Sequence, residues 1–395
     1  MGKEKIAFVC QRYGLEVNGG SELYCRQIAE KLTAFYEVHV YTTCAMDYST
    51  WANVYQPGEE VINGVRVHRF LTDREREMSR FAEISEKVYT SKKRTKEDEL
   101  TWIKEQGPVC DLLLEELYTH KGEYKAILFM TYLYYLTAMG MLRDYPNAIL
   151  IPTVHDEPPV YLKHYDKVFL AAKAIAWNTY EEKTFAEKRF SGVERIPCAM
   201  TGIGVEAPKG KLPELPEELK KVQYITYAGR IDESKGCGEM FRYFLQYKKL
   251  FGGDLKLVLM GKPVMEIPDH PDIINLGFVS EEMKFSVMRS ALALVLFSHF
   301  ESLSMVVLES MLMGKPVLVT EKCDVLKGHC VRSNAGLYFN TFAEFVLTLD
   351  YLRDHPAEYG IMCQNGKKYV QRNYQWDVIL QKYCGLIDGV SENRQ

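Results

Sequence analysis

The sequence has 395 residues, of which 47% are hydrophobic and 26% are charged, values typical of soluble globular proteins. This composition excludes a disordered, collagen-like or disulfide-scaffold chain. Lysine and arginine total 49 against 53 aspartates and glutamates, a net charge of -4, so no excess of positive charge favours nucleic acids. At roughly 150 residues per domain, the length predicts two or three domains, of which two is the starting expectation.

Apolar runs and cysteines indicate the compartment. The longest apolar runs, such as residues 291–297, are much shorter than the roughly 18 residues of a membrane-spanning helix. The apolar run at residues 6–10 is also too short for the core of a signal peptide. The ten cysteines are scattered and include no C-x-x-C pair, which favours neither a zinc site nor a disulfide framework. We expect a cytoplasmic protein with reduced thiols and no transmembrane segment.

The first half of the chain alternates predicted strands and helices. A strand over residues 5–11 leads through an N-G-G turn at residues 18–20 into a helix from about Ser21, which can cap it. Further strands are predicted at residues 37–43, 126–131, 148–154 and 174–178. The pattern is that of a doubly wound parallel sheet, so we predict a Rossmann-like domain over residues 1–200.

Two local signals modify this first domain. Asn63-Gly64 between two apolar runs predicts a β-hairpin. Residues 72–106 are highly charged with both signs interspersed, which predicts an exposed helical excursion with a solvated face. Its basic run at residues 92–96 is alternatively a contact for anionic lipid.

The second half repeats the same organisation. Residues 201–222 are rich in proline, glycine and charge, which predicts an interdomain linker. A new βα unit opens with a strand over residues 223–229, and helices end the chain from about residue 342. Further strands are predicted at residues 255–260, 273–276, 293–297 and 316–320. We predict a second Rossmann-like domain over residues 201–374 and a terminal helix over 375–395.

An E-x7-E segment at residues 301–309 follows one of these strands. Glu301 falls in the turn at the carboxyl end of the strand, where open α/β sheets bind ligands. We expect the N–H groups from Ser302 to Met305 to begin a helix and to form a site for an anion such as a diphosphate. Glu309 lies in the helix on an apolar face, where a carboxylate is costly unless hydroxyls or a cation satisfy it.

A second loop, G-R-I-D-E-S-K-G at residues 229–236, follows the first strand of the same domain. Arg230 and Lys235 can converge on an anion from two directions. The alternative is a solvated loop in which these cations pair with Asp232 and Glu233. The position at a strand's carboxyl end favours the phosphate site.

Together these motifs resemble the retaining glycosyltransferases of family 4, of the group 1 type, which have the GT-B fold. The loop at residues 229–236 is followed by F-E-S-L-S-M-V-V-L-E-S-M-L-M-G-K-P-V at residues 300–317. Further matching pieces occur in the same order along nearly the whole chain: Asn18-Gly19-Gly20-Ser21-Glu22, His155-Asp156, Leu276-Gly277-Phe278-Val279-Ser280 and Tyr374-Gln375-Trp376. The resemblance implies two Rossmann-like α/β domains facing a central cleft, with the terminal helix crossing back to the first domain.

The resemblance also implies roles for individual residues. Arg230 and Lys235 would hold the donor diphosphate, Glu309 the ribose, and Glu301 the transferred sugar. The other donor-site residues implied are Ser302, Leu303 and Ser304 in the turn, Gly20 from the first domain, and Val279 near the base. On the acceptor side the implied residues are Gly19, Asp156 and Tyr132. His155 would face the sugar as a catalytic residue together with Glu301, Arg230 and Lys235; a metal ligand pair with Glu157 and a structural histidine are the alternatives.

The sequence departs from the family at one point, because Ser302 and Ser304 stand where members usually have glycines. The implied reaction retains the anomeric configuration, with the departing diphosphate accepting the acceptor's proton. A nucleotide-diphosphate sugar is then the co-substrate and a glycan or lipid-linked glycoconjugate the acceptor, with no further cofactor and no metal. The usual setting of such members is the synthesis of surface polysaccharide.

Three rival functions stay open. The same fold can carry a sugar-nucleotide epimerase or a phosphorylase, or a non-catalytic protein that only binds nucleotide sugars. A nicotinamide dehydrogenase is disfavoured, because neither opening βα turn contains G-x-G-x-x-G.

Overall fold

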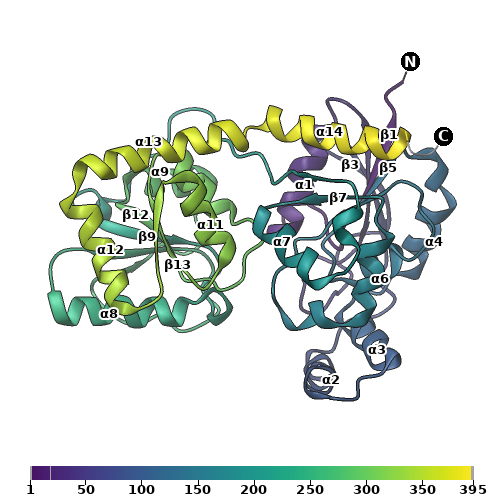
Figure 1. Ribbon diagram of the computed structural model, residues 1–395, viewed down its shortest axis with the longest axis horizontal. Coiled ribbons are helices and arrows are strands. Elements are labelled where there is room, and N and C mark those ends of the chain that lie inside the picture. The colour runs from purple at the N-terminus through teal and green to yellow at the C-terminus, as the bar shows by residue number, and fades with distance from the viewer. Residues whose placement is uncertain (1, 18, 393–395) are drawn as a thin grey trace. The chain divides into compact units, whose positions relative to one another are not determined.

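The computed structural model of the chain describes residues 2–17 and 19–392 (Figure 1). It divides into two compact units. Unit 1 comprises the chain up to Ile203 together with the residues from Leu380 onward, and unit 2 comprises Gly204–Ile379. Among the described residues, no helix has the length and apolar character needed to span a membrane.

In unit 1 the described residues form an eight-stranded sheet in the order β3-β4-β2-β1-β5-β6-β7-β8, parallel except for the β3–β4 pair. Its strands are β1 (Lys5–Val9), β2 (Glu37–Thr43), β3 (Gly58–Ile62), β4 (Val65–Phe70), β5 (Ala126–Met130), β6 (Ala148–Ile151), β7 (Ala174–Trp177) and β8 (Cys198–Met200). Its helices are α1 (Gly20–Leu32), α2 (Met78–Thr90), α3 (Lys96–Gln106), α4 (Asp111–Thr119), α5 (Tyr135–Gly140), α6 (Lys163–Ala171), α7 (Tyr180–Arg189) and the part of α14 (Trp376–Glu392) beyond Leu380, with short 3-10 turns η1 (Lys121–Glu123), η2 (Pro158–Tyr161) and η3 (Val193–Arg195).

In unit 2 the described residues form a six-stranded parallel sheet in the order β11-β10-β9-β12-β13-β14. Its strands are β9 (Tyr224–Ala228), β10 (Lys256–Met260), β11 (Ile273–Asn275), β12 (Ala293–Leu296), β13 (Val317–Thr320) and β14 (Gly336–Phe339). Its helices are α8 (Cys237–Phe251), α9 (Glu281–Ser290), α10 (Met305–Leu312), α11 (Asp324–Ser333), α12 (Phe342–Asp354) and α13 (Pro356–Asn373), with 3-10 turns η4 (Glu217–Leu219) and η5 (Glu233–Lys235).

Both sheets follow from apolar strands that helices cover on two faces. Every residue of β5 and β12 is buried, as expected for central strands of parallel sheets. The two-Rossmann α/β fold predicted from the sequence is therefore confirmed. The hairpin is also present, with Asn63 and Gly64 at the positive φ angles that its tight turn requires.

Two local predictions are wrong. Helix α1 begins at Gly20 with Gly19 as its N-cap, and the Ser21 hydroxyl donates to Glu22 Oε2 instead of capping the helix. The charged excursion is not wholly solvated: α2 is mostly exposed, but α3 buries Trp102 and Ile103 in the core of unit 1. Figure 1 shows the two helices side by side at one end of this unit. The sequence did not predict this burial, because charged residues interrupt the apolar residues of α3.

Helix α14 supplies packing to unit 1 through its later residues. Tyr383 is buried, and its hydroxyl lies 2.9 Å from that of Tyr24 on α1. Tyr24 also donates to the Gly202 carbonyl at 2.8 Å. The later part of α14 therefore packs in the core of unit 1, although it follows unit 2 in sequence.

Candidate active site

The sheet of unit 2 has a topological switch point between β9 and β12. The chain leaves β9 toward β10 on one side, whereas β12 continues toward β13 on the other, so the loops after β9 and β12 diverge there. Gly236 makes their close approach possible, because a Cβ at this position would lie 2.2 Å from the Phe297 carbonyl oxygen. The two motifs singled out in the sequence therefore meet at one edge of the sheet.

Lys235 and Glu301 form an ion pair at this edge. Lys235 Nζ lies 2.8 Å from Glu301 Oε1, although the residues come from the two different loops. Burial by itself would lower the pKa of Lys235, but the Glu301 carboxylate outweighs it and the pKa lies above its usual value. The ammonium is therefore charged at neutral pH and faces a half-buried carboxylate.

Arg230 follows the alternative that the sequence left open. Its guanidinium pairs with Asp232, which in turn accepts from the Ser234 hydroxyl at 2.6 Å and the Lys235 amide at 3.1 Å. Asp232 thus caps η5 and orders the loop. The Arg230 side chain is 43% exposed, so its positive charge remains accessible beside Lys235.

The turn after β12 differs from the prediction in where its helix begins. Helix α10 starts at Met305, so the amides of Ser302, Leu303 and Ser304 belong to the turn and not to the first helical turn. Ser304 is the N-cap with φ 63°, a left-handed conformation that costs a non-glycine residue about 1–2 kcal/mol. Its hydroxyl is buried and has no hydrogen-bond partner among the described residues. The serine therefore holds a strained conformation beside the candidate anion site.

His329 on α11 supports this turn from behind. Its side chain is fully buried, and Nε2 donates to the Leu303 carbonyl at 2.8 Å. The neutral ring then has Nδ1 as an acceptor for the Tyr369 hydroxyl, 3.0 Å away. Burial, with a smaller contribution from Arg332, lowers the pKa of His329 to about 3. No motif in the sequence pointed to this contact, because it joins segments that only the sheet order brings together.

This histidine predicts a pH dependence of stability. Below the unfolded pKa of about 6.5, the unfolded chain takes up a proton that folded unit 2 excludes, so the free energy of unfolding falls by up to about 1.4 kcal/mol per pH unit. The loss continues down to the folded pKa of about 3. His329→Gln keeps an amide donor for the Leu303 carbonyl but does not titrate. Denaturant unfolding at pH 7, 6 and 5 should therefore show that the free energy of unfolding falls less steeply with decreasing pH in this variant than in the unaltered protein. Equal pH dependence in the two proteins would refute the assignment.

Glu309 lies on α10 and is paired with Lys284 on α9. Lys284 Nζ is 2.9 Å from Oε1 and 2.9 Å from Oε2 of the carboxylate. Burial raises the pKa of Glu309, and the Lys284 ammonium opposes this rise. The sequence predicted that hydroxyls or a cation must satisfy Glu309, but it did not identify Lys284. Val279, in the loop that leads into α9, is half-buried at the same end of the sheet.

The predicted glycines of unit 1 lie next to a buried ion pair. Glu22 Oε1 accepts from Arg12 Nε at 2.9 Å, from Arg12 Nη2 at 2.6 Å and from Gln11 Nε2 at 2.9 Å. A Cβ at Gly19 would lie 2.0 Å from Glu22 Oε2, which explains the glycine. Gly20 is exposed at the start of α1. The Arg12–Glu22 pair was not foreseen.

The predicted acceptor residues do not all reach the surface. Tyr132 is buried and donates to Glu157 Oε1 at 2.7 Å, so its hydroxyl contacts the loop that carries Asp156, and its contact with an acceptor stays a prediction. Glu157 Oε2 also lies 3.5 Å from His155 Nε2. Asp156 is exposed and accepts from Tyr161 at 2.7 Å. Tyr132 therefore acts on this loop from below, through Glu157.

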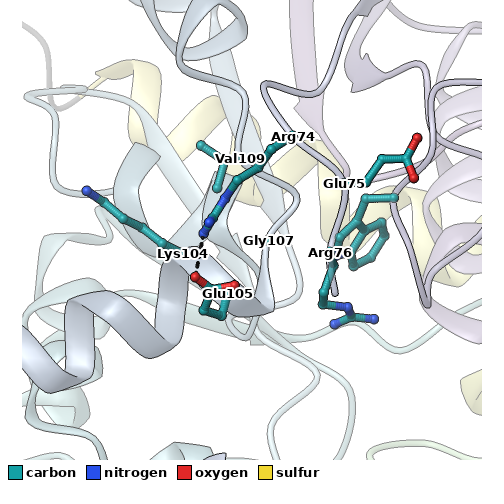
Figure 2. Close-up of a pocket in the computed structure, with 8 residues that line it drawn as sticks. Arg74, Glu75, Arg76, Lys104, Glu105, Gly107 and Val109 are labelled. Carbon is teal, nitrogen blue, oxygen red and sulfur yellow. Dashed lines mark ion pairs between the residues drawn. The ribbon is translucent and has the colours of Figure 1, made fainter. Parts of the chain in front are cut away.

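A shallow pocket with no room for a water molecule lies elsewhere in unit 1 (Figure 2). Arg74 and Arg80 pair there with the buried carboxylate of Glu105 at 3.0 and 3.1 Å. Arg76 points away from this ion pair in Figure 2 and donates to backbone carbonyls, including Ser49 O at 2.7 Å. These charged groups pair with one another or with backbone carbonyls. The pocket therefore joins α3 to the neighbouring loop and is not part of the candidate active site. Across residues 2–17 and 19–392, no group of three or more His, Cys, Asp or Glu side chains is placed to hold a metal ion.

Comparisons with known proteins agree with this geometry. Residues 222–349 match the family described as Glycosyl transferases group 1, and this segment contains the candidate donor-site residues of unit 2. No curated protein sequence matches the chain.

Several solved structures are similar over nearly the whole chain. Sucrose-phosphate synthase from Thermosynechococcus elongatus has 15% identity and a TM-score of 0.69, with 98% of this chain and 99% of that chain covered. An E. coli structure described as trehalose-6-phosphate bound with UDP-2-fluoro glucose has 13% identity, a TM-score of 0.70 and the same coverage. HepE from Anabaena, in complex with UDP and glucose, has 13% identity, a TM-score of 0.66, and coverage of 98% and 100%. The chain has the GT-B fold, and a segment of its second unit matches the family Glycosyl transferases group 1, which supports a glycosyltransferase.

Proposed function

We propose that the protein is a retaining glycosyltransferase of family 4 that transfers a sugar from a nucleotide-diphosphate donor to a glycan or lipid-linked acceptor. The observation that carries the proposal is the meeting of Lys235 and Glu301 at the β9/β12 switch point. Cations and a carboxylate at such an edge suit a diphosphate next to a sugar. The segment that matches Glycosyl transferases group 1 contains both residues.

In this proposal, different residues of unit 2 bind different parts of the nucleotide-sugar donor. Arg230 and Lys235 bind the diphosphate, and the turn amides at Leu303 and Ser304 supply further donors to it. Glu301 accepts hydrogen bonds from the transferred sugar, and Glu309 accepts them from the ribose. In unit 1, Gly19, Gly20, Asp156 and His155 serve the reacting groups and the acceptor.

The reaction breaks the bond between the anomeric carbon and the diphosphate oxygen, and the acceptor oxygen bonds to the same face of the sugar. The acceptor's proton passes to the departing diphosphate. Arg230 and Lys235 stabilise its growing negative charge, which is typically worth about 2.7–4 kcal/mol per donor group. These cations take the place of a metal ion in the proposal, so a transfer rate that falls on chelation with EDTA would contradict it.

The proposed setting is surface polysaccharide synthesis in the cytoplasm, at or near the inner face of the membrane. An epimerase would interconvert the donor without an acceptor, a phosphorylase would require inorganic phosphate, and a binding protein would show neither transfer nor hydrolysis. Product analysis of donor alone, donor with phosphate, and donor with acceptor separates these cases.

Ligand binding gives the first test, because it requires no knowledge of the acceptor. A nucleoside diphosphate at 100 times its dissociation constant should stabilise the protein by about 2.7 kcal/mol. This corresponds to roughly 5 °C or more in melting temperature for a domain of this size. UDP is the first probe, since two similar structures contain UDP or a UDP sugar, followed by GDP, ADP, CMP and dTDP.

The matched pair of variants is Glu309→Ala and Glu281→Ala, because both remove a carboxylate that pairs with Lys284. We expect the nucleotide to raise the melting temperature of Glu281→Ala but not that of Glu309→Ala. If none of the nucleotides binds at millimolar concentration, the donor site does not exist.

A further inference from the structure

Lys284 is a buried cation at the donor edge of unit 2. Its Nζ lies 2.9 Å from each oxygen of Glu309 and 2.8 Å from Glu281 Oε2. The side chains of Lys284 and Glu309 are only 15% and 13% exposed, whereas Glu281 is 64% exposed. Only the contact to Glu309 Oε1 is a hydrogen bond, and the buried Oε2 has no hydrogen-bond partner among the described residues. Lys284 therefore clamps Glu309 and is not a free cation awaiting a ligand.

The clamp leaves Glu309 able to bind something else. Each carboxylate oxygen has two acceptor positions. The ammonium fills one on Oε1, whereas the buried Oε2 accepts no hydrogen bond from the described residues. The remaining positions lie on a carboxylate fixed in rotation by its two contacts. Such a group is suited to accept two hydroxyls on adjacent carbons, as a ribose presents them.

The environment of Glu309 explains why a cation is required. Apart from Ser310, its buried neighbours on α10 are apolar, namely Val307, Leu308 and Met311, and burial raises the pKa of its carboxyl. The charged groups that act on it come from α9: Lys284 lowers the pKa and Glu281 raises it. On the other side of α10, the α13 groups Cys363 and Lys367 act on Lys315, beyond the C-terminal end of α10.

We propose that Lys284 is a positioning residue of the donor site, which keeps Glu309 ionised and oriented for the ribose hydroxyls of the nucleotide. The inference rests on the proposed function and deepens it. Lys284 acts only through Glu309, so its loss changes nucleotide binding in a pH-dependent way. A purely structural lysine would alter stability and leave the pH profile of binding unchanged.

The experiment compares UDP affinity in unaltered protein, Lys284→Met and Lys248→Met by calorimetry at pH 8.5, 7.5 and 6.5. Lys248 is the matched control, because it is another buried lysine of unit 2, paired with Asp272 at 2.9 Å. The dissociation constant of each variant is divided by that of the unaltered protein at the same pH. The titration of UDP itself is common to all proteins and cancels in this ratio.

For Lys284→Met we expect a ratio that rises as pH falls, approaching tenfold per pH unit below the new pKa of Glu309, because the protonated carboxyl is the weaker acceptor. The Lys248→Met ratio should stay near one at every pH. The double variant Lys284→Met/Glu309→Gln has no carboxylate to bury, so it guards against misfolding. It should bind UDP weakly with a flat ratio.

The other possible outcomes contradict either the positioning role of Lys284 or the proposed function as a whole. A flat Lys284→Met ratio in a protein that binds UDP overturns the positioning role alone. Tighter binding by Lys284→Met shows that the lysine competes with the nucleotide and also overturns it. If the unaltered protein binds none of the nucleoside diphosphates, the proposed function fails, and this inference fails with it.

Discussion

Replacing Lys235 by methionine is expected to lower the rate of sugar transfer by about 10²–10³-fold, the usual effect of removing one group that stabilises transition-state charge. The variant loses the ammonium that is to bind the departing diphosphate. It also leaves the half-buried Glu301 carboxylate without its partner at 2.8 Å. The rate of nucleoside diphosphate release from the donor, in the presence of acceptor, is the measurement.

A double variant separates the two consequences. If Lys235 and Glu301 only satisfy each other, Lys235→Met/Glu301→Gln should recover most of the activity lost in Lys235→Met. If each contacts the donor, as proposed, the double variant should be at least as slow as the slower single variant. Lys235→Arg is the conservative control, because it keeps the charge while changing its geometry. Recovery in the double variant would remove both residues from the proposed mechanism.

The Arg12–Glu22 pair predicts a large effect on stability. Arg12→Met should lower the free energy of unfolding of unit 1 by about 3–5 kcal/mol, because it strands a buried carboxylate. Glu22 would keep hydrogen bonds from Gln11 and Ser21 but lose the only cation that contacts it within the described residues. The double variant Arg12→Met/Glu22→Leu should regain most of this loss, since it buries no charge.

Tryptophan fluorescence during urea unfolding is a suitable probe, because three of the four tryptophans, Trp51, Trp102 and Trp177, are buried in unit 1. The midpoint of the unit 1 transition should fall sharply in Arg12→Met and much less in the double variant. Equal losses in both would mean that packing of the arginine, and not its charge, stabilises this part of unit 1. The surface pair Lys5–Glu123 of unit 1 offers a control, since exposed pairs contribute only about 0–1 kcal/mol.

Much of the fold was predictable because its signals are local. The prediction for residues 37–43 has the bounds of β2, and other predicted strands lie within one to three residues of β1, β5, β9 and β12. Short apolar and β-branched runs between turn residues are sufficient to indicate buried parallel strands. Two strands were missed: β8 has only three residues, and β14 opens with a glycine and is only partly buried.

The candidate donor site was predictable in outline for a related reason. Carboxyl ends of parallel strands share one edge of a sheet, so Lys235 and Glu301 could be placed on that edge from their positions after two strands. The apolar neighbours of Glu309 in the sequence also predicted that its carboxylate needs a polar or cationic partner. The identity of that partner did not, because Lys284 lies on another helix at no characteristic spacing from Glu309.

The sequence was sufficient to establish that the chain forms two Rossmann-like units and that cations and carboxylates gather at one edge of the second. The order of the strands placed β9 beside β12, and thus joined Lys235 to Glu301 at 2.8 Å. Packing between helices and loops paired Lys284 with Glu309, set His329 behind Leu303, and buried Tyr132. The physical reason is that strand and helix formation depends largely on residues that are close together in the sequence. Contacts between side chains far apart in sequence depend on which strands and helices adjoin, and that is set by the sum of all the packing.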